Sequence, residues 1–147
     1  MRVEDAPACA AMACDSEIGA RYGFRPDAMA EKLSAAAARG EAFVACEGGE
    51  PLGFAWIDPR GAFSSAPYLR LIAVARGLRG SGVGSALMDE YERRTASVGR
   101  DWCLLVSDFN AAAIAFYERR GYRRAGELPD FAVEGVAEVL MVKRLPR

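Results

Sequence analysis

The spacing of apolar and polar residues predicts helices in the first third of the chain. Residues 5–12 are rich in alanine, and residues 27–39 lie between a proline and a glycine, which are typical start and stop signals of a helix. Two apolar segments, 42–47 and 52–58, flank a Gly-Gly-Glu-Pro turn. This pattern predicts two strands joined in a hairpin.

The middle of the chain reads as strand, helix, strand. Residues 68–74 become almost continuously apolar, as expected for a strand buried on both faces. Residues 82–98 carry apolar side chains at i, i+4 and i+8, which gives a helix one apolar stripe. Residues 102–106 form a second apolar segment. This order predicts a βαβ unit whose two strands are parallel.

The last third predicts one more helix, 110–120, and strands at 122–124 and 136–144 around a loop that contains proline and glycine. No repeat or linker divides the chain. We therefore expect residues 1–147 to form a single domain of mixed α/β class. Its sheet should be mostly antiparallel, with a central parallel βαβ unit and helices on both faces.

Charge and hydropathy narrow the classes of partner. Lys and Arg number 19 and Asp and Glu 20, for a net charge of -1. Without a basic excess we expect no nucleic-acid partner. No apolar run approaches the roughly 20 residues that span a bilayer, and the N-terminus lacks the pattern of a signal peptide. We therefore expect a cytoplasmic protein with no membrane partner.

The chain has no histidine, and its four cysteines include no C-x-x-C pair. This composition predicts that there is no metal site. It also removes catalysis by Ser-His or Cys-His pairs. Any chemistry must then rely on tyrosine, carboxylates, backbone amides or water.

A glycine-rich segment between the first strand and the helix of the βαβ unit predicts an anion site. Glycine permits positive φ and close approach of the backbone. Free N–H groups at a helix N-terminus favour an anion by about 0.3–1 kcal/mol, or up to about 2 kcal/mol when sheltered. A pyrophosphate fits such a turn, to which serine hydroxyls add donors. The expected binding residues are Arg79, Gly80, Ser81, Gly82, Val83, Gly84 and Ser85.

Other nucleotide-binding motifs fit this segment poorly. A Walker loop needs Gly-Lys-Ser/Thr, which is absent from the sequence. A dinucleotide fingerprint needs a third glycine where Ser85 stands, and its acidic partner should end the next strand, whereas Asp101 precedes it. The structural alternative is a plain glycine-rich loop.

Two motifs carry a family resemblance. Arg79 to Gly84 reads RGSGVG, similar to the R/Q-x-x-G-x-G/A pattern of motif A in the GCN5-related N-acetyltransferase (GNAT) family. Asn110 to Tyr122 is similar to that family's N-x-x-A-x-x-F-Y-x-x-x-G-F/Y motif. The resemblance covers residues 43–145 and implies a GNAT-like fold. Members of the family usually begin with a strand, but the N-terminus of this chain leaves room only for a very short one.

The resemblance implies acetyl-CoA as acetyl donor, held in a cleft where two adjacent parallel strands splay apart. The backbone of Ile72, Ala73 and Val74 would pair with the pantetheine arm, and one of these amides would polarise the acetyl carbonyl. The glycine turn would hold the pyrophosphate. Asn110 would contact the pantetheine, and it also suits an ordinary helix N-cap.

The implied chemistry is direct attack of a neutral primary amine on the thioester. Tyr117 matches the family's general acid, which would protonate the leaving thiolate; the alternative is a core tyrosine. The strand before Asn110 lacks the glutamate that some members carry. Asp108 is the first candidate for the general base, and Glu138 and a water relay are the others. Each carboxylate also suits an ordinary solvated position.

The implied function is an N-acetyltransferase, and the alternative is a non-catalytic acyl-CoA-binding regulatory domain. The sequence leaves the acceptor open among a protein N-terminus, a lysine, a free amino acid, a polyamine and an aminated drug. It leaves open the use of other acyl-CoAs and a homodimer formed through exposed edges. Arg70 and Tyr68 interrupt an apolar strand; Arg70 would either read an acidic group on the substrate or point outward.

Overall fold

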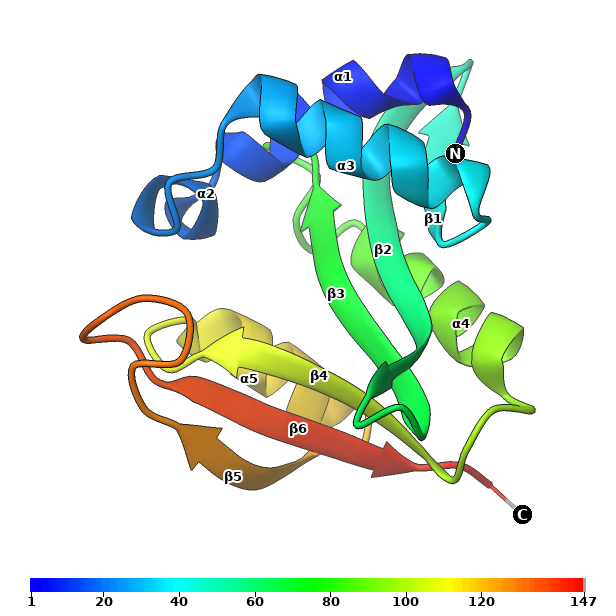
Figure 1. Cartoon of the computed structure of the whole chain (residues 1–147). Helices are drawn as coiled ribbons and strands as arrows, with labels where there is room; N and C mark the ends of the chain where they lie inside the picture. The colour runs from blue at the N-terminus through cyan, green and yellow to red at the C-terminus, as the bar shows by residue number, and fades with distance from the viewer. Residues whose placement is uncertain (147) are drawn as a thin grey trace. The chain divides into compact units, whose positions relative to one another are not determined.

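The computed structural model describes residues 1–146 and contains a six-stranded sheet of order β1-β2-β3-β4-β6-β5 (Figure 1). The strands are β1 (Ala42–Glu47), β2 (Glu50–Ala62), β3 (Ala66–Val74), β4 (Asp101–Ser107), β5 (Arg123–Leu128) and β6 (Glu138–Arg144). The helices are η1 (Val3–Asp5), α1 (Ala6–Cys14), α2 (Glu17–Arg21), α3 (Pro26–Ala38), α4 (Val83–Thr95) and α5 (Ala111–Arg119). The mixed α/β class is confirmed.

The strand directions confirm the predicted βαβ unit. β3 pairs in parallel with β4 through Tyr68–Cys103 and Leu69–Leu104, with α4 between them in the chain. β1 with β2, β4 with β6, and β5 with β6 are antiparallel. The chain divides into two compact units, the first made of Met1–Ile57 and Arg70–Arg94, and the second of Asp58–Leu69 and the residues from Thr95 onward.

In the first unit, β2 lies between two helical layers. Phe54 is completely buried in an apolar cluster with residues of α1 and α3. A Cβ added to the preceding Gly53 would lie 2.9 Å from Val83 Cγ1 and 3.1 Å from Leu87 Cδ1 of α4. Because successive strand residues face opposite sides, α1 and α3 cover one face of β2 and α4 covers the other. The prediction of helices on both faces is confirmed here.

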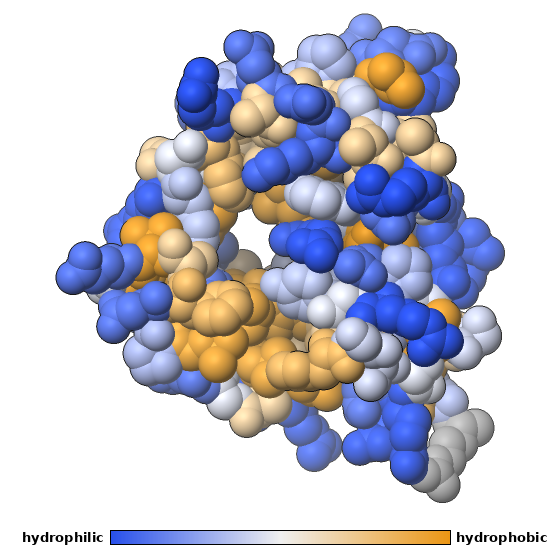
Figure 2. All heavy atoms as spheres, in the orientation of Figure 1, coloured by the Kyte–Doolittle hydropathy of each residue, from blue (hydrophilic) through white to orange (hydrophobic). Residues whose placement is uncertain are grey.

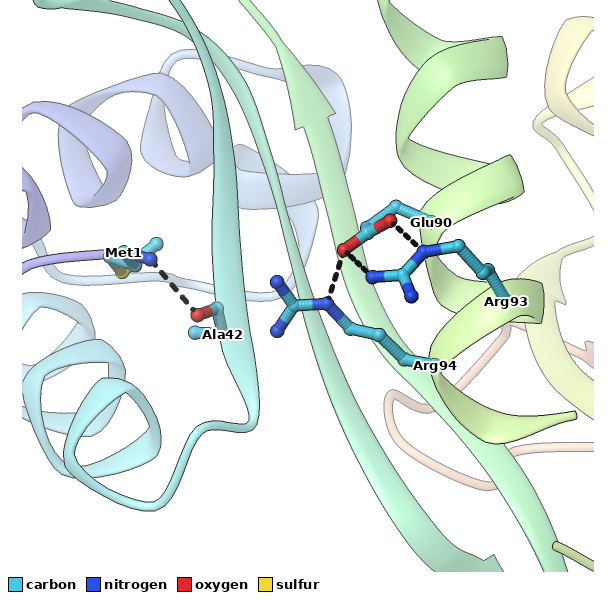
Figure 3. A network of polar contacts seen from close by, with 5 residues as sticks. All are labelled: Met1, Ala42, Glu90, Arg93 and Arg94. Carbon is cyan, nitrogen blue, oxygen red and sulfur yellow. Dashed lines mark hydrogen bonds and ion pairs between the residues drawn. The ribbon is translucent and has the colours of Figure 1, made fainter. Parts of the chain in front are cut away.

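Figure 3 shows two sets of polar contacts in the first unit, one within α4 and one between the N-terminus and β1. Glu90 accepts hydrogen bonds from Arg93 at 2.7 Å and from Arg94 at 2.6 Å. These bonds lower the pKa of Glu90 to about 2. The guanidinium carbon of Arg94 lies 4.6 Å from the centroid of the Phe43 ring in β1. The N-terminal amine donates to the carbonyl of Ala42, the first residue of β1, at 3.3 Å.

A tight corner joins α1 to α2. The Ser16 hydroxyl donates to the Ala13 carbonyl at 2.7 Å and accepts from the Gly19 N–H at 2.9 Å. A Cβ on Gly19 would lie 2.7 Å from the Cys14 carbonyl oxygen. This position is closed to any side chain because the clash is with backbone.

In the second unit, α5 packs on one face of β4 and β6. The side chain of Lys143, in β6, lies 5.7 Å from the Tyr122 ring just beyond α5 and 5.3 Å from the Trp102 ring of β4. The Trp102 indole N–H donates to the Thr95 hydroxyl at 3.0 Å, and both side chains are buried. Tyr122 and Met141 are also buried in this core.

Three sequence predictions need correction. β2 runs to Ala62, so most of the expected loop 58–67 is a hairpin whose turn lies near Phe63. The first strand of the tail extends to Leu128 and not only to residue 124. The end of β3 is half-buried and not buried on both faces, because packing against α1 and α3 covers its Leu71 and Ala73 only in part. As expected, no strand precedes β1 among residues 1–146.

Candidate functional site

The turn from β3 to α4, in the first unit, depends on glycine for its backbone conformation. Gly77, Gly80 and Gly82 have φ of 85°, 80° and 93°. A Cβ added to any of the three would meet no atom within 4 Å. Glycine is therefore required by the positive φ angles and not by steric clashes. The space beside this backbone is open. Gly84 differs from them, since it lies inside the first turn of α4.

Hydrogen bonds within the turn use some of the donors that the sequence assigned to a ligand. The Ala75 N–H donates to the Leu52 carbonyl at 2.8 Å, and the Leu78 N–H donates to the Ala75 carbonyl at 3.0 Å. The Ser81 N–H donates to the Leu78 carbonyl at 3.2 Å, and the Ser81 hydroxyl donates to the same oxygen. Ser81 thus holds the turn together, a role that the sequence analysis did not foresee.

The N-terminus of α4 carries the remaining donors. The Ala86 N–H donates to the Gly82 carbonyl at 3.0 Å, as the first bond of the helix. Val83, Gly84 and Ser85 occupy the first turn, whose N–H groups have no partner within a helix. No acidic side chain lies in this turn. A helix start without acids, beside an exposed Arg79, favours an anion.

The end of β3 leads into this turn. Ile72, Ala73 and Val74 are all half-buried. They belong to the same unit as the glycine turn. The pantetheine-pairing segment and the pyrophosphate-binding segment predicted from the sequence are therefore contiguous.

In the second unit, Asn110 caps α5. Its side-chain oxygen accepts a hydrogen bond from the Ala113 N–H at 3.2 Å, and its carbonyl accepts one from the Ile114 N–H at 3.1 Å. The N-cap alternative for this residue is confirmed. Because only the amide oxygen takes part in the cap, the predicted coenzyme contact would fall to the Nδ2 group.

Tyr117 lies on α5 and is only 6% exposed. Its ring packs edge-on against the rings of Phe116 and Tyr122, at centroid distances of 5.3 and 5.9 Å. Burial, and secondarily the neighbouring Tyr68, raises the pKa of Tyr117. Its hydroxyl therefore keeps its proton at neutral pH. The core position and the proton-donor role are thus compatible.

The two candidate carboxylates differ in environment. Asp108 follows the end of β4 and is exposed. Glu138 begins β6 and is 5% exposed, and burial raises its pKa. From sequence, Asp108 is the first candidate because it follows a buried strand. The sequence signal that favours Glu138 is its place at the start of the apolar run EVLMV, which draws it into the sheet.

The structure places the predicted residues in two groups. Ile72 to Val74 and Arg79 to Ser85 lie in the first unit, and Asp108, Asn110, Tyr117 and Glu138 lie in the second. Arg70 is exposed, with its guanidinium carbon 5.5 Å from the centroid of the Trp56 ring. Tyr68 is half-buried in β3. Within residues 1–146, no helix has the length and apolarity to cross a membrane, and no cluster of His, Cys, Asp or Glu side chains suits a metal ion.

Comparison with known proteins gives consistent matches. The model of the acetyltransferase (GNAT) family matches residues 10–122. Blasticidin-S acetyltransferase of Streptomyces morookaense is 35% identical over 78 residues, which are 53% of this chain and 57% of that protein. This match therefore spans little more than half of the relative.

Solved structures share the fold. Ard1 from Thermoplasma volcanium has a TM-score of 0.82 at 21% identity, with 100% of this chain and 95% of that chain covered. An aminoglycoside 6'-N-acetyltransferase complexed with coenzyme A has a TM-score of 0.77 at 19% identity, with 97% and 92% covered. Likeness at these identities concerns the fold.

Proposed function

The chain belongs to the acetyltransferase (GNAT) family, and on this premise we propose that it transfers an acetyl group from acetyl-CoA to a primary amine. One observation carries the proposal. A turn with glycines at positive φ opens onto free space and leads into a helix start that has no acidic side chain. This combination fits a diphosphate.

In this proposal, residues of the first unit bind the coenzyme. The N–H groups of Val83, Gly84 and Ser85 would face the diphosphate, and the Arg79 guanidinium would add a charge-assisted contact. The backbone of Ile72 to Val74 would pair with the pantetheine arm. Bound acetyl-CoA supplies a thioester whose sulfur leaves as a thiolate.

In the second unit, Tyr117 is the proposed proton donor for the leaving sulfur. A tyrosine hydroxyl keeps its proton at neutral pH, and burial raises the pKa of Tyr117 further. A general acid of this kind contributes about 10²–10⁴-fold to a rate. The presence of a tyrosine at this position of the family motif favours catalysis over a purely regulatory acyl-CoA-binding role.

The relatives suggest where to look for the acceptor. Two of the similar proteins are named for acetylation of blasticidin S and of an aminoglycoside. We include a small amine of this kind as one acceptor class. Protein N-termini, lysine, free amino acids and polyamines form the other classes.

The test is a two-step screen of the full chain. Thermal shift should show stabilisation by CoA and acetyl-CoA but not by NAD or FAD, because binding to the folded state raises its stability. Release of free thiol from acetyl-CoA should then depend on one class of amine in the panel. Coenzyme stabilisation without turnover on any amine would favour the regulatory domain. No coenzyme stabilisation would refute the proposal.

A further inference from the structure

The ends of three strands meet at Glu138. In the antiparallel pairings, Glu138 is opposite Ser107, the last residue of β4, and opposite Leu128, the last residue of β5. The Asp108 N–H donates to the Ala137 carbonyl at 2.9 Å, which fastens the two chain segments just beyond this point. Glu138 and Ser107 are both buried, at 5% and 4% exposure.

Strand alternation sets the direction of the Glu138 side chain. Lys143 lies against the Tyr122 and Trp102 rings, on the α5 side of the sheet. Because side chains alternate along β6, Val139 and Met141 share that side, whereas Glu138 and Leu140 face away from α5. The register of β4 with β6 has no irregularity that would change this alternation.

The face away from α5 is apolar, and among the described residues of this unit no helix covers it. α5 lies behind β4 and β6 in Figure 1, and Figure 2 shows apolar atoms gathered over these strands in the same view. Leu105 and Leu140, which are paired across the two strands, are half-buried on it. Glu138 is thus a carboxylate at the edge of an apolar surface.

Burial of a carboxylate is costly because its charged form loses hydration. Desolvation disfavours the charged form and raises the pKa of Glu138. The residues opposite it, Ser107 and Leu128, carry no charge, while Glu127 on β5 and Asp108 after β4 are exposed. A base whose pKa lies nearer to neutral accepts a proton more effectively than an ordinary carboxylate.

We propose that Glu138 is the general base of the transfer reaction and that exposed Asp108 is not. This inference rests on the proposed function. Glu138 takes one proton from the ammonium form of the acceptor, and the nitrogen lone pair freed in this way forms the new C–N bond to the acetyl carbon. The C–S bond breaks, its electron pair stays on sulfur, and Tyr117 donates the proton that sulfur receives. The acetylated nitrogen then loses its second excess proton, which restores the Tyr117 hydroxyl, and Glu138 releases its proton to solvent.

The test compares three amide variants by pH–rate profile at saturating acetyl-CoA. Glu138→Gln should lower kcat/KM for benzylamine by about 100-fold at neutral pH. The loss should shrink as pH rises and free amine accumulates. Asp108→Asn and the matched control Glu127→Gln, on the neighbouring strand, should stay within about twofold of the parent chain. Their coenzyme-induced thermal shifts should all be equal.

A second nucleophile separates a base from a structural residue. Hydroxylamine is already neutral at neutral pH, so Glu138→Gln should acetylate it nearly as fast as the parent chain. An equal loss on hydroxylamine and benzylamine, or a loss in Asp108→Asn instead, would overturn the assignment.

A direct titration makes the inference independent of finding the acceptor. In the full chain labelled with ¹³C at glutamate carboxyls, the signal missing from Glu138→Gln should titrate above the ordinary glutamate range. Titration in or below that range would refute the assignment. If the parent chain is active and Glu138→Gln is equally active, only the assignment of Glu138 as the base is refuted. If the parent chain neither binds coenzyme nor shows activity, the proposed function is refuted.

Discussion

The two units of the chain carry candidate residues of different kinds. In the first unit, the turn from β3 to α4 acts through its backbone, with positive φ at Gly80 and Gly82 and N–H groups at the start of α4. In the second unit, the candidate groups are side chains, Tyr117 and Glu138, both almost completely buried. The proposed role of the first unit therefore depends on glycines, which have no side chain. The proposed role of the second unit depends on the chemistry of two side chains.

This difference predicts two kinds of sensitivity. A substitution in the glycine turn should weaken coenzyme binding and leave the chemical step intact once the coenzyme is bound. A substitution of Tyr117 should slow the chemical step and leave binding intact. The first two predictions below test this separation.

The largest effect is expected for Tyr117→Phe. Loss of the proton donor should lower kcat by about 100-fold, while the Kd for acetyl-CoA changes by less than about twofold, because the ring and its packing remain. Steady-state kinetics and calorimetry measure the two quantities. Tyr122→Phe is the matched control, since Tyr122 packs on the same ring and should keep full activity. An unchanged kcat in Tyr117→Phe would remove the proton-donor role.

A smaller effect is expected for Gly82→Val. A β-branched residue at φ of 93° is strained, and a left-handed conformation costs about 1–2 kcal/mol. The Kd for acetyl-CoA should rise about tenfold. Gly48→Val is the control, because Gly48 also has positive φ and open space but lies in the β1–β2 turn. Equal weakening of binding in both variants would show a general loss of stability.

The Glu90 network should matter for stability and not for catalysis. Glu90 has a side chain that is 30% exposed and a pKa lowered to about 2. A lowered pKa stabilises the folded state above the ordinary value of 4.5, and this contribution disappears as pH falls toward about 2. Glu90→Gln should therefore cost about 1 kcal/mol or less at neutral pH, and nothing near the lowered pKa. Urea unfolding at several pH values checks this, with kcat unchanged.

The smallest effect is expected in thiol labelling of the native chain, which needs no substitution. Cys46 is exposed, whereas Cys9 and Cys103 are buried. Burial raises the pKa of Cys9 to about 12, so its thiolate is scarce at neutral pH. Mass spectrometry after brief reaction with iodoacetamide should find Cys46 modified first. Early modification of Cys9 would show that the cluster of α1 and α3 opens readily.

The sequence predicted most of the fold because local signals and tertiary packing agree. The run WCLLV is a buried strand, and the alanine-rich first helix packs on α3 through small side chains. The extension of β2 to Ala62 was missed because Pro59 and Gly61 suggest a loop, and only pairing in the sheet overrides that local preference.

The site was predictable to different depths in the two units. Glycines at fixed spacing reveal a backbone conformation directly, so the turn after β3 was recognised from sequence. The environment of a carboxylate depends instead on residues distant in sequence. The apolar run EVLMV indicates a buried strand at Glu138, but the surroundings of its carboxylate are set by pairing with Ser107 and Leu128.

The corner at Gly19 sets a limit on how the protein can evolve. Its backbone contacts exclude every side chain at this position, although it belongs to neither family motif. Random libraries that cover this corner should therefore return Gly19 unchanged. A library designed only around the recognised motifs would leave Gly19 open to substitution, and many of its variants would carry a backbone clash at this corner.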